Sequence, residues 1–297
     1  MQFTSKHIEH YRTHGYVIVE NFLTHDELTR AQQEIENIIP GWLEYAENPN
    51  KPMPDRLQDP PRTRRQNRFP FVGDQLNAIT LHPDLRAFAA VNAGHDNLFC
   101  EQADLAYKYQ GHRADREQLM HVDYTNHTLV YPTIDQQYWQ TAYLIYYTDV
   151  DEGLAPTAVC SWQHYKDEIL WPTSYKKHQR ASLYDNEIKV VVPAGSVLAY
   201  SMRTFHRGTA FKRPGARIGE FVTYAPSNCP WLGIVGWPEQ GDNHSFQGWV
   251  EKATVEERGL LGFPAPGDRY WNREALAGVA ARFPGMDLGP YQNESSS

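Results

Sequence analysis

The pattern of apolar positions changes character near residue 97. Before that point, apolar side chains recur at helical spacing. Helices are expected at 4–13, 24–39 and 83–93. Thr24 and Glu27 have the spacing of a capping box, and Pro83 suits the first turn of a helix. Only the β-branched run 16–19 is typical of a strand. The segment 1–97 is therefore predicted to be a mostly helical flank.

From Leu98 onward, short β-branched and aromatic runs follow one another. Strands are expected at 98–109, 140–149, 188–192, 197–201 and 217–224. Turn sequences such as Pro193-Ala194-Gly195 separate several of them. Many short strands after a helical start predict an α+β, mainly β fold, a sandwich or barrel with helices outside. We expect one domain over 1–297, with its core at 98–226. The remainder, 227–297, would be an irregular extension or lid that ends in a helix near 273–281.

Composition narrows the class of protein. Of the 297 residues, 41% are hydrophobic and 22% are charged, which is typical of a globular protein. The net charge of −8 opposes binding to nucleic acid or an anionic membrane. No apolar run is long enough to span a bilayer, and the first residues lack the pattern of a signal peptide. Three cysteines without clustered spacing indicate reduced thiols. We expect a soluble cytoplasmic monomer or homodimer with a small-molecule substrate.

Two His-x-Asp pairs are candidate metal ligands, because side chains at i and i+2 of a strand point to the same side and can bind one metal ion. With 13 histidines in the chain, roughly one such pair would arise by chance. His82-Pro83-Asp84 lies where a helix should begin, so Asp84 has a structural explanation at the helix N-terminus. His121-Val122-Asp123 lies between two expected strands. We therefore take His121 and Asp123 as the candidate ligands.

A third ligand and a cation follow in the same β-rich region. His206 comes after the strand 197–201, and Arg217 follows eleven residues later at the start of the next strand. Two histidines and one carboxylate on one face of an iron ion leave positions open for co-substrate and oxygen. An arginine fork binds a carboxylate with two hydrogen bonds. The order His121, Asp123, His206, Arg217 predicts a non-haem iron(II) oxygenase.

In these residues the chain resembles the phytanoyl-CoA dioxygenase family, over about residues 10–226. The run Gly15–Leu23 is similar to the family's opening strand, and Pro193–Leu198 is similar to the turn before its distal histidine. The resemblance implies a double-stranded β-helix of the jelly-roll, cupin-like type. It also implies iron(II), 2-oxoglutarate and O2 as cofactors, with ascorbate as the usual assay reductant. Succinate and CO2 would be by-products.

The resemblance extends to further residues and also has departures. It implies that Gln102, together with Arg217, contacts 2-oxoglutarate. Tyr124, Asp104 and Tyr107 are candidate substrate contacts beside the metal pair and on the strand that leads to it. Many members carry Pro-Gly-Ser-His where this chain has Ser161-Trp162-Gln163-His164, and a hydroxyl residue where it has Gly208. These changes argue against an acyl-CoA substrate more than against the chemistry.

Four outcomes remain open at this stage. Hydroxylation of a small organic metabolite is the first, because related halogenases replace the residue at Asp123 with a small one. The same cofactors also support desaturation, epoxidation or cyclisation of a natural product. A cupin-like binding protein without turnover is the alternative outside enzymes, and a purely structural β sandwich would require His121, Asp123, His206 and Arg217 to be coincidental.

Overall fold

Two antiparallel five-stranded sheets form the core of the computed structural model, which describes residues 3–51, 67–111, 115–124, 135–165, 168–229, 244–268 and 270–292. The main sheet runs in the order β1 (Tyr16–Val19), β8 (Val197–Ser201), β4 (Thr141–Tyr146), β10 (Ala216–Pro226) and β2 (Leu98–Tyr109). The minor sheet runs β6 (Ser174–Tyr175), β3 (Met120–His121), β9 (His206–Gly208), β5 (Thr157–Cys160) and β7 (Glu187–Lys189). The expected jelly-roll, cupin-like class is confirmed.

The two sheets differ greatly in strand length. In the main sheet β10 pairs with β2 along their whole lengths, from Ala216 opposite Tyr109 to Pro226 opposite Leu98. All residues of β4 and β8 are buried, as expected for strands covered on both faces. The minor sheet consists of strands of two to four residues. The main sheet therefore supplies most of the β framework.

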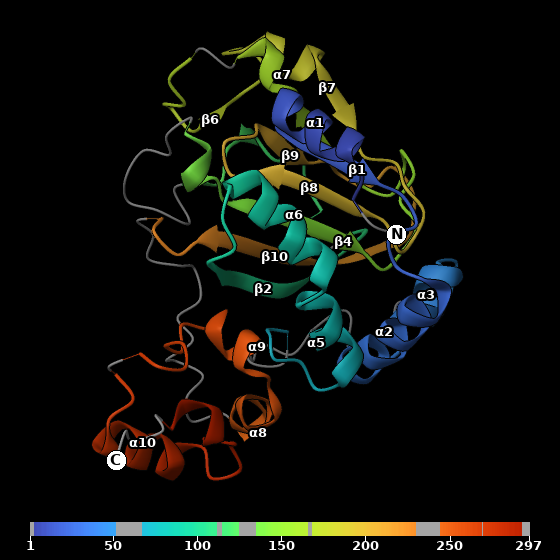
Figure 1. Cartoon of the computed structure of the whole chain (residues 1–297). Helices are drawn as coiled ribbons and strands as arrows, with labels where there is room; N and C mark the ends of the chain where they lie inside the picture. Colours follow the sequence, from blue (N-terminus) through green and yellow to red (C-terminus); the bar gives the residue numbers. More distant parts are fainter. Residues whose placement is uncertain are drawn as a thin grey trace.

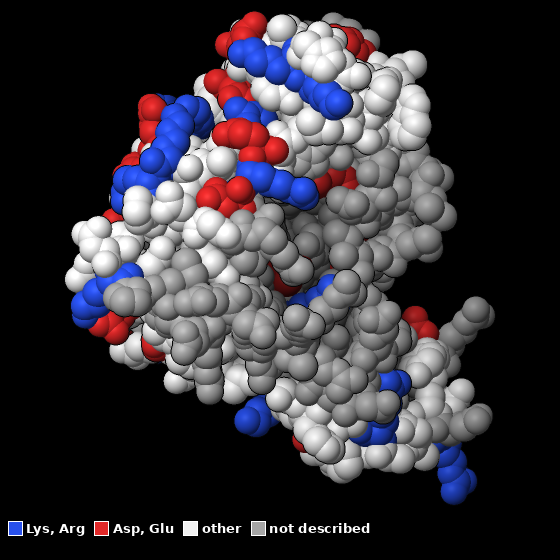
Figure 2. Space-filling view, turned by 180° about the vertical axis from the view of Figure 1, so that it is seen from behind, with Lys and Arg blue, Asp and Glu red and all other residues white. Residues whose placement is uncertain are grey.

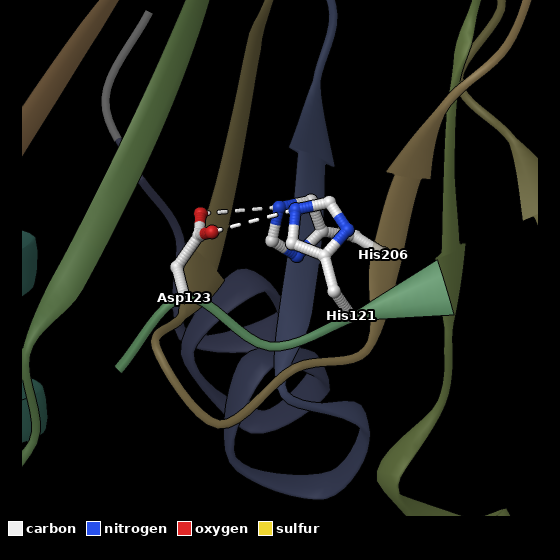
Figure 3. A group of neighbouring side chains, drawn as sticks. All are labelled: His121, Asp123 and His206. Carbon is white, nitrogen blue, oxygen red and sulfur yellow. Dashed lines mark ion pairs between the residues drawn. The ribbon is translucent and has the colours of Figure 1, made fainter. Parts of the chain in front are cut away.

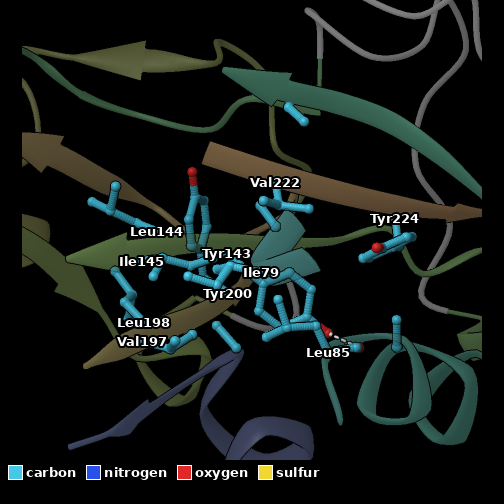
Figure 4. Packing of buried hydrophobic residues seen from close by; sticks show 14 of the residues in the cluster. Ile79, Leu85, Tyr143, Leu144, Ile145, Val197, Leu198, Tyr200, Val222 and Tyr224 are labelled. Carbon is cyan, nitrogen blue, oxygen red and sulfur yellow. Dashed lines mark hydrogen bonds between the residues drawn. The ribbon is translucent and has the colours of Figure 1, made fainter. Parts of the chain in front are cut away.

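Most helices cover one face of the main sheet or extend beyond its edge, whereas α7 (Ala181–Asp185) lies beside β7 of the minor sheet, as Figure 1 shows. The other helices are α1 (Ser5–His14), α2 (His25–Ile38), α3 (Trp42–Glu47), α5 (Asp74–Thr80), α6 (Pro83–Ala93), α8 (His244–Lys252), α9 (Val255–Gly259) and α10 (Arg273–Arg282), with short 3-10 turns at Gln136–Tyr138, Trp162–His164 and Gly289–Tyr291. Helix α6 crosses the face of the main sheet (Figure 1). In the core between them, Tyr143 donates a hydrogen bond of 2.7 Å to the Leu85 carbonyl (Figure 4).

Local sequence signals account for most element ends. The capping box of Thr24 and Glu27 is present, and α6 begins with His82 as its cap. Gly15 ends α1 in the left-handed region, at φ 79°. The Trp162 indole packs closely against it: an added Cβ would lie 2.1 Å from Trp162 Nε1. Glycine is therefore required at this position.

Several expectations need adjustment. The strand expected at 16–19 within the helical flank is present as β1, but it belongs to the core, where its residues pair with β8 in the main sheet. The expected strand at 188–192 is limited to Glu187–Lys189. Helices α3, α5, α8 and α9 gave no clear periodicity in the sequence. Within the described residues, no helix is long and apolar enough to cross a membrane. The division into one domain with an extension stays a prediction.

Candidate active site

The two candidate histidines face each other across the minor sheet. His121 on β3 and His206 on β9 are direct partners in the antiparallel ladder. Asp123 lies two residues beyond His121, and its carboxylate reaches both rings (Figure 3). The distance from Asp123 Oδ1 to His121 Nε2 is 3.4 Å, and that from Oδ2 to His206 Nε2 is 3.1 Å. Residues far apart in the sequence thus converge on one point.

Backbone carbonyls fix how the two rings are presented. His121 Nδ1 lies 2.8 Å from the Leu119 carbonyl, and His206 Nδ1 lies 2.9 Å from the Thr204 carbonyl. A carbonyl oxygen only accepts hydrogen bonds, so each Nδ1 must carry the proton. In the neutral rings, both Nε2 lone pairs therefore point at the Asp123 carboxylate. Such an arrangement is repulsive unless a proton or a metal cation lies between the three groups.

The three side chains of the triad shift one another's pKa values. Burial by itself raises the pKa of Asp123, but His206 and His121 together hold that pKa well below its ordinary value. Burial lowers the pKa of His121, whereas the hydrogen bond to the Asp123 carboxylate raises it, and the net shift is upward. The Asp123 side chain is therefore an ionised carboxylate, the form that binds a metal cation.

The donor set fits a divalent metal. One ligand atom from each of His121, Asp123 and His206 lies within 4.8 Å of the others, the only such group among the described residues. Ligands about 2.1 Å from one ion and at right angles to each other lie about 3 Å apart, close to the separations observed. Two imidazoles and one carboxylate match the facial triad of iron(II) oxygenases. The competing pair at His82 instead caps α6: its Nδ1 accepts from the Asp84 amide at 3.1 Å.

A cavity of about 300 Å³ opens beside the triad. Its lining comes from both sheets: Gln102, Ala106, Tyr107, Lys108, Gln118, His121, Asp123, Leu144, Thr157, Tyr200, His206, Gly208, Arg217 and Phe221. A view from the side opposite to Figure 1 shows a hollow near its middle, with acidic and basic side chains interspersed around it (Figure 2). The cavity is the natural place for a co-substrate and a substrate next to the metal.

One end of this cavity is lined by two cations. Arg217 and Lys108 are direct partners across β10 and β2, a like-charge pair that destabilises a sheet unless an anion joins it. Arg217 donates to the Ala155 carbonyl and to Thr157 Oγ1, and no carboxylate in the described chain pairs with it. Burial and then Arg217 lower the pKa of Lys108 to about 8. The buried hydroxyl of Tyr146 is also near Arg217, whose positive charge opposes the rise in the pKa of Tyr146 that burial causes.

This end fits the distal carboxylate of 2-oxoglutarate. A carboxylate between the cations would neutralise both and supply acceptors for their remaining donors. Gly219 and Ala106, partners across the same two strands, have small side chains or none, which leaves space toward the triad. The sequence indicated Arg217 but not Lys108, because only the strand register shows that the two face each other.

The other predicted site residues separate into two groups. Gln102 and Tyr107 line the cavity. Asp104 accepts a hydrogen bond of 2.8 Å from Gln102 Nε2 but is not part of the lining. Tyr124 is buried away from the cavity, and its hydroxyl donates to the Leu170 carbonyl at 3.1 Å. The roles of these residues stay predictions.

Comparison with known proteins agrees with this geometry. A profile of the phytanoyl-CoA dioxygenase (PhyH) family matches residues 11–219, more than two thirds of the chain. The chain belongs to the phytanoyl-CoA dioxygenase family. Family membership and the His-Asp-His group confirm the expected enzyme class, a non-haem iron oxygenase dependent on 2-oxoglutarate, and its expected cofactors. No curated protein sequence matches this PhyH-family chain.

Solved structures share the fold at low sequence identity. AviO1 from Streptomyces viridochromogenes Tue57 is 18% identical, with a TM-score of 0.53 over 77% of this chain and 98% of AviO1. HygX from Streptomyces hygroscopicus, with nickel, 2-oxoglutarate and hygromycin B bound, is 16% identical, with a TM-score of 0.54 over 77% and 89%. The carbocyclase SnoK from nogalamycin biosynthesis is 19% identical, with a TM-score of 0.50 over 76% and 85%.

Proposed function

We propose that this PhyH-family protein hydroxylates a small organic metabolite, with iron(II) held by His121, Asp123 and His206. The observation that carries the proposal is the pairing of two features in one cavity. At one side of the cavity, three ligand atoms converge, and the Nδ1 atom of each histidine already donates a hydrogen bond to a backbone carbonyl. At one end, Arg217 and Lys108 face each other as a like-charge pair. The first feature fits a metal, and the second fits a dicarboxylic co-substrate.

Bound iron(II), with 2-oxoglutarate and O2, supplies an oxidant able to remove hydrogen from an unactivated carbon, and succinate and CO2 are released. The chain itself binds and orients. Arg217 and Lys108 hold the distal carboxylate of 2-oxoglutarate, and the Thr157 hydroxyl is fixed beside them by Arg217. Leu144 and Phe221 supply apolar walls that limit water in the cavity.

Gln102 is better placed for the substrate than for the distal carboxylate. It lies six residues from Lys108 on β2, a separation of about 20 Å along the strand, which a five-carbon diacid does not span. Gln102 and Arg217 therefore serve different ends of the cavity. Gln102, held by Asp104, and the ring of Tyr107 offer the substrate amide hydrogen bonding and an aromatic surface.

Succinate release tests the reaction class. The wild-type protein with iron(II), 2-oxoglutarate, O2 and ascorbate should release succinate, and Asp123→Ala should reduce this release to background, because the carboxylate ligand is lost. Asp84→Ala is the matched control, since it alters the same His-x-Asp pattern at the start of α6. Full turnover in Asp123→Ala would show that the metal site is wrong. Wild-type metal binding without turnover, under any substrate tried, would favour the binding-protein alternative.

Product mass separates oxygen insertion, by hydroxylation or epoxidation, from desaturation and ring closure. HygX is described with hygromycin B and SnoK as a carbocyclase, which supports offering natural products of this kind as trial substrates. Hydroxylation adds one oxygen atom, whereas desaturation or ring closure removes two hydrogens. We further propose a cytoplasmic location, supported by the absence of disulfides among the three cysteines. The oligomeric state, monomer or homodimer, is measured by sedimentation.

A further inference from the structure

Tyr200 on β8 connects the main sheet to the triad in the minor sheet. Its hydroxyl donates to Asp123 Oδ2 at 3.4 Å. Its ring lies 4.7 Å from the ring of His206, and its side chain lines the cavity while remaining 2% exposed. The contact thus joins one ligand through a hydrogen bond and a second ligand through ring packing.

Asp123 is the ligand whose orientation depends most on such a contact. His121 and His206 lie within strands and are fixed by backbone carbonyls at Nδ1. Asp123 lies beyond the end of β3, which stops at His121. A carboxylate can rotate about its side-chain bonds and present either oxygen, or both, to a metal. A donor fixed in the main sheet removes part of this freedom.

We propose that Tyr200 is a positioning residue for the metal, holding one oxygen of Asp123 by a hydrogen bond so that the other remains available as the iron ligand. The inference rests on the proposed function, because it assumes that Asp123 binds iron. A phenol is a donor at neutral pH, since its ordinary pKa is about 10. Outer-shell partners of this kind orient a ligand and typically contribute 10- to 100-fold to metal affinity.

Removal of the hydroxyl alone separates this role from ring packing. Tyr200→Phe keeps the ring against His206 and deletes only the donor. Tyr143→Phe is the matched control, because Tyr143 lies on the neighbouring strand β4 and its buried hydroxyl donates to Leu85 in the core, away from the cavity. Both variants lose one buried hydroxyl. Thermal melting shows whether they fold and whether they lose comparable stability.

Affinity for cobalt(II) and the visible spectrum of the cobalt protein are the readouts, measured without co-substrate. Tyr200→Phe should bind cobalt about 10- to 100-fold more weakly than the wild type, with a shifted spectrum, whereas Tyr143→Phe should match the wild type in both. The same pair is then measured in an Asp123→Ala background. There, Tyr200→Phe should have no further effect, because the hydroxyl acts through the carboxylate.

The outcomes distinguish this inference from the proposed function. Wild-type affinity and spectrum in Tyr200→Phe would overturn the role of Tyr200 and leave the metal site intact. An equal loss of affinity with and without Asp123 would also overturn it, since the effect would then be a general one on packing. A wild-type protein that binds no cobalt would overturn the metal site itself, and the inference with it.

Discussion

Glu220 lies on the face of β10 opposite Arg217 and is completely buried, with 0% exposure. Its carboxyl group is hydrogen-bonded to the Thr80 hydroxyl and accepts from the Tyr147 hydroxyl at 2.7 Å. Burial raises the pKa of Glu220 from 4.5 to about 8, although the two hydroxyls partly oppose the shift. The folded protein therefore keeps a proton on Glu220 at neutral pH that the unfolded chain releases. We predict that Glu220→Gln stabilises the protein, increasingly so as pH rises.

The magnitude follows from the shift. The pKa of Glu220 is raised in the folded protein, so below about pH 4.5 its carboxyl group costs the protein no stability. As pH rises from 4.5 toward 8, the free energy of unfolding of the wild type falls, because only the unfolded chain releases the proton. At 1.36 kcal/mol per pKa unit, the cost is roughly 3 kcal/mol at pH 7. Glutamine has no proton to lose and should avoid this cost. Its amide oxygen can accept from Tyr147, and its nitrogen can donate to Thr80, whose own hydroxyl also donates to the Leu76 carbonyl.

Urea unfolding of wild type and Glu220→Gln, at about pH 5.5, 7 and 8.5, measures the effect. The advantage of the variant should grow by roughly 3 kcal/mol over this range. Glu152→Gln is the control for the change in charge, since the Glu152 side chain is 74% exposed. A difference between Glu220→Gln and wild type that does not change with pH would refute the reasoning, because it would mean that Glu220 does not carry the proton.

Three further substitutions test the anion end and one turn. Arg217→Met should raise the KM for 2-oxoglutarate at least about 100-fold, because a charged hydrogen bond and a counterion are lost together; succinate release against 2-oxoglutarate concentration measures it. Lys108→Met should raise the same KM about 10-fold. Lys108 Nζ also donates to the Arg116 and Thr209 carbonyls, and an unchanged KM would mean that Lys108 serves only these bonds. Gly15→Ala should lower the free energy of unfolding by roughly 3 kcal/mol, from left-handed strain and overlap with Trp162. A loss below about 1 kcal/mol in urea unfolding would contradict that last estimate.

Local patterns in the sequence were enough to predict the strands of the main sheet and to choose His121 and Asp123 as the candidate metal pair. The runs at 16–19 and 197–201 are observed as strands with the expected bounds, because buried strands are rich in β-branched and aromatic residues. The two His-x-Asp pairs could be separated because Pro83 marks a helix start, and α6 does begin there. Both conclusions needed only neighbours along the chain.

Long-range register was not available from the sequence. Lys108 is important only because it faces Arg217, a pairing set by how β10 aligns with β2 over more than a hundred intervening residues. Strands as short as β3 and β9 give too few residues for a periodic signal. Tyr124 follows Asp123 directly, yet its hydroxyl donates to the Leu170 carbonyl, because β3 ends at His121 and the chain beyond it no longer follows a strand pattern.

The placement of the two triad histidines on such short strands has a consequence for how a metal at the proposed site would be held. His121 and His206 share a single ladder pair, whereas β10 and β2 form a long ribbon. Segments with few ladder bonds open in local fluctuations while the rest of a fold stays closed. Iron that binds only the closed form raises the free energy of that opening. Loss of the ion would then be a local event that leaves the co-substrate end assembled. The active fraction of the protein in a cell would follow the supply of iron and not the stability of the fold.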